Sequence, residues 1–395
     1  MVDYADRVKG MKASEIRELL KLTQDPKMIS FGGGMPSPHS FPVKGIQKIA
    51  DKILKKHGAQ ALQYGPTEGI KQLKESLIKR MKKKGIKCNE DEILITSGSQ
   101  QALDLMPKIF LNPGDFIVVE CPSYVGALVA FNAYQPKFIS ISMDDNGMNT
   151  YELEEKIKEH KGKPIKFIYT VPTFQNPAGV TMSLEKRKHL LEIARKYKIL
   201  IFEDDAYSEL RYSGKPIPSI KSLDKDGNVI YTSTFSKILS PGFRLGWVIA
   251  DKDIIRKMVI AKQGTDLSSN IFVQYIADEY IRSGMIDKQI PKIKKMYKRK
   301  RDIMLRALKK HFPKGCKWTK PAGGLFIWVT LPSHIYTKEM FKEAIKEKVA
   351  YVHGEAFCVE GKGHNEMRLN FSNTDNDKIE IGIKRLAKII KEKMK

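Results

Sequence analysis

Between residues 90 and 250, short runs rich in β-branched and aromatic residues alternate with stretches of helical periodicity. This alternation is typical of a mainly parallel sheet covered by helices, because each parallel strand needs a long crossover connection to reach the next. Seven runs are expected strands: 92–96, 116–120, 137–143, 167–171, 199–203, 229–232 and 246–250. Open sheets of this kind bind ligands at the carboxyl ends of their strands, so the residues that follow each run are candidates for a functional site.

A second, smaller domain is expected toward the C-terminus. Residues 288–311 have the spacing of one long basic helix, and 325–330 and 367–371 are expected strands. The predicted fold class is α/β: a seven-stranded, mainly parallel sheet between helices (an α/β/α sandwich) beside a smaller α+β domain. We expect an N-terminal arm and part of the small domain in 1–40, the large domain in 41–287 and the small C-terminal domain in 288–395.

The charge of the chain points toward an anionic partner but does not identify one. Its 395 residues include 70 Lys and Arg against 45 Asp and Glu, a formal net charge of +25. Only 14 of the 70 are Arg, the residue that reads bases and phosphates best, and the basic runs 79–87 and 292–301 have no interleaved aromatic residue besides Tyr297. We therefore expect solvated helix faces and no specific nucleic-acid partner.

Cysteine usage and hydropathy favour a reduced, cytoplasmic protein. No apolar run approaches the ~18 residues of a membrane span, so no membrane partner is expected. The four cysteines lie far apart without a C-x-x-C motif, and the eight histidines form no H-E-x-x-H motif. We accordingly expect neither a disulfide framework nor a metal site.

The most informative segment, 232–246, follows the expected strand at 229–232. Within eleven residues it offers the hydroxyls of Thr234 and Ser236, the amine of Lys237 and the guanidinium of Arg244. A lysine amine can form a Schiff base with an aldehyde, while arginine and hydroxyls can hold a phosphate of the same molecule. The same residues would also occur in an ordinary loop with a surface arginine. The segment alone therefore does not decide between a cofactor site and an ordinary loop.

Other strand ends carry compatible side chains. Asp204 ends an apolar strand, where a buried carboxylate needs a cation such as a protonated pyridine nitrogen, or else serves as a helix N-cap. The backbone amides of Ser99 and Gln100 open a helix and form an anion site, although Ser is also a common cap. Asn176 could donate to a phenolate oxygen, or it could be an ordinary turn residue. Tyr124 could stack on a ring, or it could be an ordinary core residue.

Taken together and in this order, these segments resemble fold type I pyridoxal-phosphate-dependent aminotransferases. The resemblance covers essentially the whole chain and is strongest to the branch with the 2-aminoadipate and kynurenine aminotransferases. The matching motifs are Ala61-Leu-Gln-Tyr-Gly-Pro-Thr-Glu-Gly, Gly98-Ser-Gln-Gln-Ala-Leu, Gln175-Asn-Pro-Ala-Gly, Glu203-Asp-Asp-Ala-Tyr, Thr234-Phe-Ser-Lys and Met367-Arg-Leu-Asn-Phe-Ser. This resemblance implies a transaminase, with pyridoxal 5'-phosphate as cofactor bound by the large domain.

The resemblance also implies a role for each matching residue. Lys237 would form the aldimine with the cofactor, and Asp204 would pair with its ring nitrogen; these two are the expected catalytic residues. Arg368, Asn176 and the backbone of Gly34 would bind the substrate. The remaining cofactor contacts would come from Ser99, Gln100, Tyr124, Asn176, Tyr207, Thr234, Ser236 and Arg244, and from Tyr64 of the second subunit of a homodimer.

The expected reaction is ping-pong transfer of an amino group between an L-amino acid and a 2-oxo acid. Arg17 stands where relatives carry an arginine that meets an acidic side chain, so glutamate/2-oxoglutarate is the first expected pair, with 2-aminoadipate, aromatic or branched-chain amino acids as other donors. Arg17 could equally pair with Glu on its own helix. Other pyridoxal-phosphate chemistry, such as that of a β-lyase, is one alternative. The second is a binding-only, ligand-sensing domain. Relatives of that kind carry an N-terminal winged-helix module, and the about 90 residues before the first expected strand leave no room for one, which argues against this alternative.

Overall fold

The computed structural model describes residues 2–11, 25 and 27–394. Within them, one eight-stranded sheet has the order β2-β9-β8-β7-β6-β3-β4-β5. Strands β8, β7, β6, β3 and β4 run parallel to one another, and β9 and β5 are antiparallel to their neighbours. The strands are β2 (Ile93–Thr96), β3 (Phe116–Cys121), β4 (Lys137–Asp144), β5 (Gly147–Met148), β6 (Ile165–Thr170), β7 (Leu200–Asp204), β8 (Val229–Thr234) and β9 (Gly246–Ile249).

This architecture confirms the predicted fold class with one correction: the large sheet has eight strands and not seven. The seven expected strands are all present, with ends that differ from the prediction by one or two residues. The additional strand, β5, is two residues long and pairs only with β4 across a tight turn. A two-residue strand is too short to show the alternation by which strands are recognised in a sequence.

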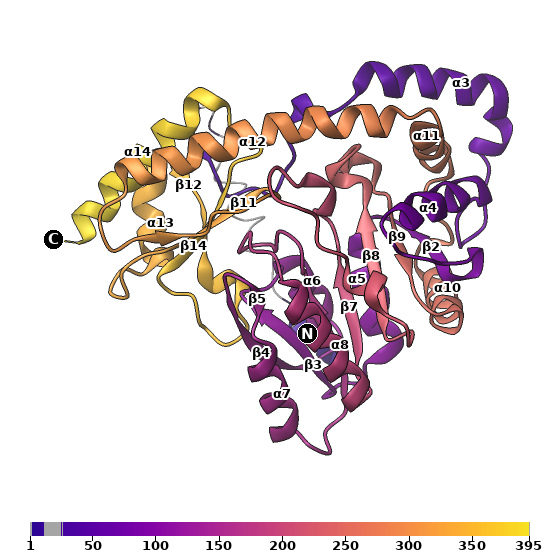
Figure 1. Cartoon of the computed structure of the whole chain (residues 1–395), viewed down its shortest axis with the longest axis horizontal. Coiled ribbons are helices and arrows are strands. Elements are labelled where there is room, and N and C mark those ends of the chain that lie inside the picture. Colours follow the sequence, from indigo (N-terminus) through magenta and orange to yellow (C-terminus); the bar gives the residue numbers. More distant parts are fainter. Residues whose placement is uncertain (1, 12–24, 26, 395) are drawn as a thin grey trace.

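Helices cover both faces of the large sheet, as expected for a sandwich (Figure 1). In β3, Ile117 and Val119 pack in the core that contains α5 (Ser99–Phe110), whereas Val118 packs in the core that contains α7 (Thr150–Glu159) and α8 (Leu184–Tyr197). Alternate residues of a strand point to opposite faces, which explains why these central strands are apolar throughout.

A four-stranded antiparallel sheet forms a second layer, with the order β10-β11-β14-β13. Its strands are β10 (Lys317–Trp318), β11 (Phe326–Thr330), β13 (Val352–His353) and β14 (Glu366–Asn370). Next to it, β1 (Ile29–Ser30) pairs with β12 (Val349–Ala350), which brings a segment near the N-terminus beside the C-terminal part. The long helix α12 (Met285–His311) begins three residues before its predicted start and contacts both α11 (Ile271–Arg282) and α14 (Asn376–Lys393) (Figure 1).

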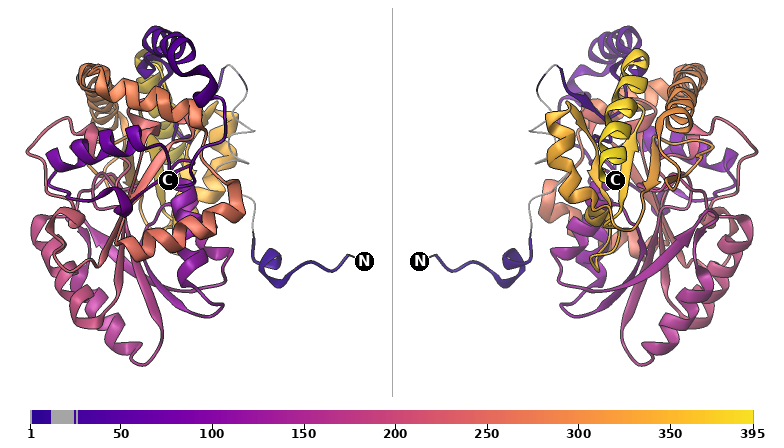
Figure 2. Two further views of the ribbon diagram at one scale, coloured as in Figure 1. Left: turned by 90° about the vertical axis from the view of Figure 1, so that its right-hand side faces the viewer. Right: turned by 90° about the vertical axis from the view of Figure 1, so that its left-hand side faces the viewer.

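The other elements surround these sheets. Figure 2 shows residues 2–11, with the short helix α1 (Asp6–Lys9), extending away from the body of the molecule. The remaining helices are α3 (Val43–Ala61), α4 (Lys71–Lys83), α6 (Val125–Asn132), α9 (Ile220–Leu223), α10 (Lys252–Asp266) and α13 (Thr337–Lys346), and the 3-10 turns are η1 (Pro38–Ser40), η2 (Glu90–Glu92), η3 (Ser208–Leu210), η4 (Phe235–Lys237), η5 (Pro241–Phe243) and η6 (Gly354–Phe357). Among the helices described, none is long and apolar enough to cross a membrane.

Candidate active site

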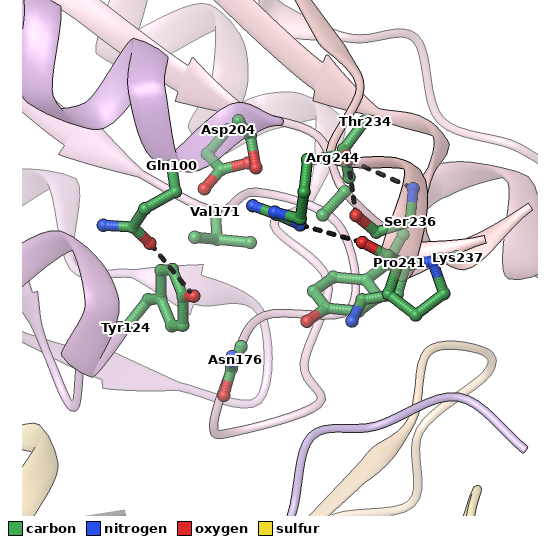
Figure 3. Close-up of a pocket in the computed structure, with 13 residues that line it drawn as sticks. Gln100, Tyr124, Val171, Asn176, Asp204, Thr234, Ser236, Lys237, Pro241 and Arg244 are labelled. Carbon is green, nitrogen blue, oxygen red and sulfur yellow. Dashed lines mark hydrogen bonds between the residues drawn. The ribbon is translucent and has the colours of Figure 1, made fainter. Parts of the chain in front are cut away.

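One cavity collects the residues that follow the strands of the large sheet (Figure 3). Ten of the eleven side chains expected to contact the cofactor line it. They are Ser99, Gln100, Tyr124, Asn176, Asp204, Tyr207, Thr234, Ser236, Lys237 and Arg244, joined by Val171, Ala206 and Pro241. The carboxyl ends of parallel strands meet at one edge of the sheet, which is why residues so distant in sequence share one cavity.

One end of the cavity has the chemistry of an anion site. Helix α5 begins there at Ser99, and its first backbone amides have no partner within the helix. A Cβ atom on Gly98 would lie 2.6 Å from Nη2 of Arg244, so the guanidinium packs directly on the backbone beside this helix start. Thr234 Oγ1 lies 2.9 Å from Ser236 Oγ and accepts from the Ser236 amide. Amides, hydroxyls and a guanidinium therefore converge, as a phosphate group requires.

Asp204 lies at the last position of β7 and is 3% exposed. The Tyr169 hydroxyl donates to its Oδ2 at 3.0 Å, but Oδ1 is buried without a hydrogen-bond partner among the described residues. Burial raises the pKa of this carboxyl to about 7. An ionised, buried and half-satisfied carboxylate is costly, so the site is suited to a cationic or N–H group next to Oδ1.

The helix-cap alternative for Asp204 is wrong, because the backbone amide at the start of the next turn donates to its neighbour Asp205. The Asp205 side chain accepts from the Ser208 backbone amide at 3.1 Å and from the Ser208 hydroxyl, at the start of η3. It also accepts from the Tyr231 hydroxyl at 2.8 Å. Asp205 is therefore satisfied by the protein itself, whereas Asp204 faces the cavity.

Lys237 ends the short turn η4 and lines the same cavity as Asp204 and Arg244 (Figure 3). Nζ donates to the backbone carbonyl of Gly34 at 3.2 Å. Burial, followed by the positive charges of Arg368 and Arg244, lowers the pKa of this amine to about 8. At neutral pH a larger fraction of this amine is thus uncharged and nucleophilic than for an ordinary lysine.

Two tyrosines and an asparagine form the other walls of the cavity. Tyr207 is buried, and burial raises the pKa of its hydroxyl, which stays a neutral donor. Gln100 donates to the Gly126 carbonyl at 2.8 Å and lies beside the Tyr124 hydroxyl (Figure 3). These groups present an aromatic face and several hydrogen-bond donors to whatever occupies the centre of the cavity.

Arg368 lies in β14 next to Asn176, although 192 residues separate the two in sequence. It is 1% exposed; its Nη1 donates to Asn176 Oδ1 at 2.9 Å and its Nη2 to the Gly32 carbonyl at 2.6 Å. The guanidinium lies 4.5 Å from the ring centre of Phe326 and 5.0 Å from that of Phe357. Burial lowers its pKa to about 10, and among the described residues it pairs with no carboxylate. A buried arginine of this kind is suited to an incoming carboxylate.

Two expected residues fall outside this cluster. Tyr64 is 82% exposed and does not line the cavity. Arg17 lies outside the described residues. Conversely, sequence reasoning missed Phe326 and Phe357, which flank Arg368. Both are apolar residues in an ordinary strand or turn, so nothing in the sequence distinguishes them from core residues.

This fold and cavity define a class: an α/β protein with a lysine amine, a buried aspartate and an anion site at the carboxyl edge of a large sheet. The family model for aminotransferases of class I and II matches residues 28–386. The chain belongs to the aminotransferase class I and II family, and the expectation of a fold type I aminotransferase is confirmed.

Three similar proteins illustrate the range of this family. The aromatic-amino-acid aminotransferase 1 of Thermococcus litoralis is 53% identical over 99% of this chain and 95% of its own length. The crystal structure of Pyrococcus horikoshii kynurenine aminotransferase in complex with PMP, KYN and KYA is 55% identical, has a TM-score of 0.96 and covers 99% of this chain and 98% of its own. LysN of Thermus thermophilus, an α-aminoadipate aminotransferase complexed with N-(5'-phosphopyridoxyl)-L-leucine, is 36% identical, has a TM-score of 0.92 and covers the same two shares.

Proposed function

We propose that this aminotransferase uses pyridoxal 5'-phosphate to move an amino group between an L-amino acid and a 2-oxo acid in two half-reactions, the ping-pong scheme. The observation that carries the proposal is the unpartnered, buried Oδ1 of Asp204 in the cavity that holds Lys237 and the anion site. Similar proteins whose crystal structures are complexes with PMP or with a phosphopyridoxyl compound support the same cofactor. We place the enzyme in the cytoplasm.

The residues present fit this cofactor. Arg244, Ser236, Thr234 and the start of α5 would hold its phosphate, and Asp204 Oδ1 its ring nitrogen. Tyr207 and Asn176 would donate to its ring oxygen, and Tyr124 would cover one face of its ring, with Gln100 beside it. When bound, the cofactor supplies a carbonyl that accepts the amino group and a ring that accepts an electron pair.

Lys237 has two tasks in the proposed reaction. Its uncharged amine would hold the cofactor by its carbonyl carbon. Once freed by the amino group of the substrate, Nζ would accept the substrate α-proton and later release it again. A pKa of about 8 suits both tasks, because an amine near its pKa both accepts and releases protons readily. The Gly34 carbonyl, which accepts from Nζ, keeps the amine in reach of the centre of the cavity.

Arg368 and Asn176 would bind the α-carboxylate that every amino acid and 2-oxo acid substrate shares. Glutamate/2-oxoglutarate is the first proposed pair, with Arg17 recognising the acidic side chain. We propose 2-aminoadipate, aromatic and branched-chain amino acids as further donors, supported by the aromatic, kynurenine and α-aminoadipate aminotransferases among the similar proteins.

We propose that the active enzyme is a homodimer in which the partner subunit's Tyr64 completes the phosphate site. The side chain of Tyr64 is 82% exposed in the single chain, as is expected of a residue that acts in a neighbouring subunit. A Tyr64→Phe exchange should weaken cofactor binding while a mixture with Lys237→Ala chains restores part of it.

The test is a donor panel. The purified protein, loaded with pyridoxal phosphate, is mixed with each L-amino acid and 2-oxoglutarate, and glutamate, the new 2-oxo acid, ammonia and pyruvate are measured. The proposal predicts stoichiometric glutamate and new 2-oxo acid with 2-aminoadipate and aromatic donors, and no ammonia. Release of ammonia would identify a β-lyase, and cofactor binding without any turnover would identify a ligand-sensing protein.

A further inference from the structure

Glu120 is a buried carboxyl beside the cavity that the proposed reaction does not use. It lies near the end of β3 and is 2% exposed. The Thr170 hydroxyl donates to its Oε1, and the Val171 backbone amide donates to its Oε2 at 3.3 Å. These contacts connect β3 to the end of β6, where the chain enters the turn that carries Asn176.

Gln175 extends the connection to two walls of the cavity. Its Nε2 donates to Glu120 Oε2 at 3.0 Å and to the Pro122 carbonyl at 2.7 Å. Its Oε1 accepts from the Ala178 amide at 2.7 Å. Gln175 directly precedes Asn176, and Pro122 lies two residues before Tyr124, so one side chain joins the turn of Asn176 to the segment of Tyr124.

Burial at this position disfavours the ionised form of the Glu120 carboxyl. Burial raises its pKa, and among the described residues its hydrogen-bond partners are uncharged donors. An apolar residue in its place would leave those buried donors without this acceptor. Three donors therefore explain a carboxyl here, and the Gln175 amide is the one that leads to the turn of Asn176.

We propose that Glu120 is a positioning residue of the active site: by anchoring Gln175, it sets the relative placement of Asn176 and Tyr124 around the cofactor. This inference rests on the proposed function for its catalytic consequence, but the anchoring itself is a property of the protein without cofactor. A misplacement of about 1 Å at a reacting centre costs up to about 100-fold in rate.

Glu203 provides a matched control. It is also buried, near the end of β7, which is separated from β3 by β6, and burial raises its pKa to about 7. Its carboxylate accepts from the backbone amides of Ile220 and Lys221 at 2.9 and 2.7 Å, on the opposite face of the strand from Asp204. Glu203 thus anchors a helix that does not line the cavity.

The experiment compares Glu120→Leu, Glu120→Gln, Gln175→Leu and the double Leu variant with Glu203→Gln. In the cofactor-free protein, hydrogen exchange of the peptides covering 171–180 should accelerate at least tenfold in Glu120→Leu and Gln175→Leu and remain normal in Glu203→Gln. In the loaded enzyme, kcat should fall about 10- to 100-fold in the two Leu variants. The visible circular dichroism of the bound cofactor should change with it.

Two further outcomes decide between positioning and bulk structure. Glu120→Gln retains an acceptor for the Gln175 amide, so it should recover most of kcat and normal exchange. The double variant should be no slower than either single Leu variant, because both break the same connection. Normal exchange in 171–180 with unchanged dichroism in Glu120→Leu would overturn the inference, as would additive losses in the double variant. If the unmodified protein shows no turnover, the proposed function fails while the exchange result still tests the anchor.

Discussion

At one end of the cavity, the groups suited to an anion come from two short stretches, 98–100 and 234–246. At the other end, behind the wall that Asn176 forms, Arg368 meets this asparagine from 192 positions away and a carbonyl 336 positions away. The first end is fixed by local turns and by the start of one helix. The second depends on how the four-stranded sheet and the segment of Gly32 lie against the large sheet. We therefore expect changes at the first end to alter cofactor affinity and changes at the second to alter substrate affinity.

Lys237 is proposed to act on both the cofactor and the substrate, so its replacement should have the largest effect. Lys237→Ala removes the amine that attaches to the cofactor and transfers the α-proton, and kcat should fall about 1,000-fold or more. The measurement is glutamate formation with saturating cofactor and donor, and adding methylamine should restore part of the rate. Wild-type turnover by this variant would remove Lys237 from the reaction.

Asp204→Asn tests whether the buried carboxylate that the reaction needs lowers the stability of the cofactor-free protein. In the cofactor-free protein the folded carboxyl has a pKa of about 7, above its unfolded value, so the folded state holds the proton more tightly. Wild-type stability should therefore fall as pH rises from about 4 to about 7, and the variant should lack this loss. Urea unfolding should show the variant more stable by a few kcal/mol above about pH 7 and equal below about pH 4, while kcat of the loaded variant falls.

An Asp204→Asn variant that is less stable than wild type at pH 8 would mean that a residue of the protein satisfies Oδ1. Asp205→Asn is the matched control. Asp205 already accepts from Ser208 and Tyr231, so the same exchange there should destabilise the protein.

Arg368→Gln should act mainly on the substrate end. Loss of charge-assisted hydrogen bonds to a carboxylate costs about 1.5–3 kcal/mol, which corresponds to a 10- to 150-fold rise in KM. Both the amino acid and the 2-oxo acid carry that carboxylate, so both KM values should rise together. The Kd for pyridoxal phosphate should be the same in variant and wild type. A rise in that Kd would contradict the division of the cavity into a cofactor end and a substrate end.

Arg244→Gln should act on the cofactor end alone and by a smaller factor. The hydroxyls of Thr234 and Ser236 and the start of α5 remain, so Kd for pyridoxal phosphate should rise about tenfold. At saturating cofactor, KM for the donor should equal that of wild type. Fluorescence titration gives the first quantity and steady-state assays the second; a changed donor KM would contradict the division of the cavity.

The same division explains how far the site could be predicted from the sequence. Thr234, Ser236, Lys237 and Arg244 lie in one segment, so their proximity follows from chain connectivity. Asp204 was predictable from a polar residue at the end of an apolar strand, but whether it meets a cofactor or caps a helix was not. The structure gives the contact with the Ser208 amide to Asp205.

The other end was predictable only in part. The resemblance supplied Arg368, but its neighbours Phe326, Phe357 and the Gly32 carbonyl depend on packing between sheets. Backbone carbonyls carry no sequence signal, and a phenylalanine that flanks an arginine has the same letter as one in the core. Strand β5 was not predicted for a related reason: it has only two residues, and an alternating pattern cannot be recognised in so short a run.

The most direct test of the central claim is borohydride reduction of the protein loaded with pyridoxal phosphate, followed by peptide mass mapping. Reduction fixes the cofactor to the nitrogen that holds it. The account predicts one phosphopyridoxyl group per chain, on Lys237, and none after preincubation with an amino acid donor that converts the bound cofactor to its amine form. Labelling of another lysine, or no labelling at all, would contradict it.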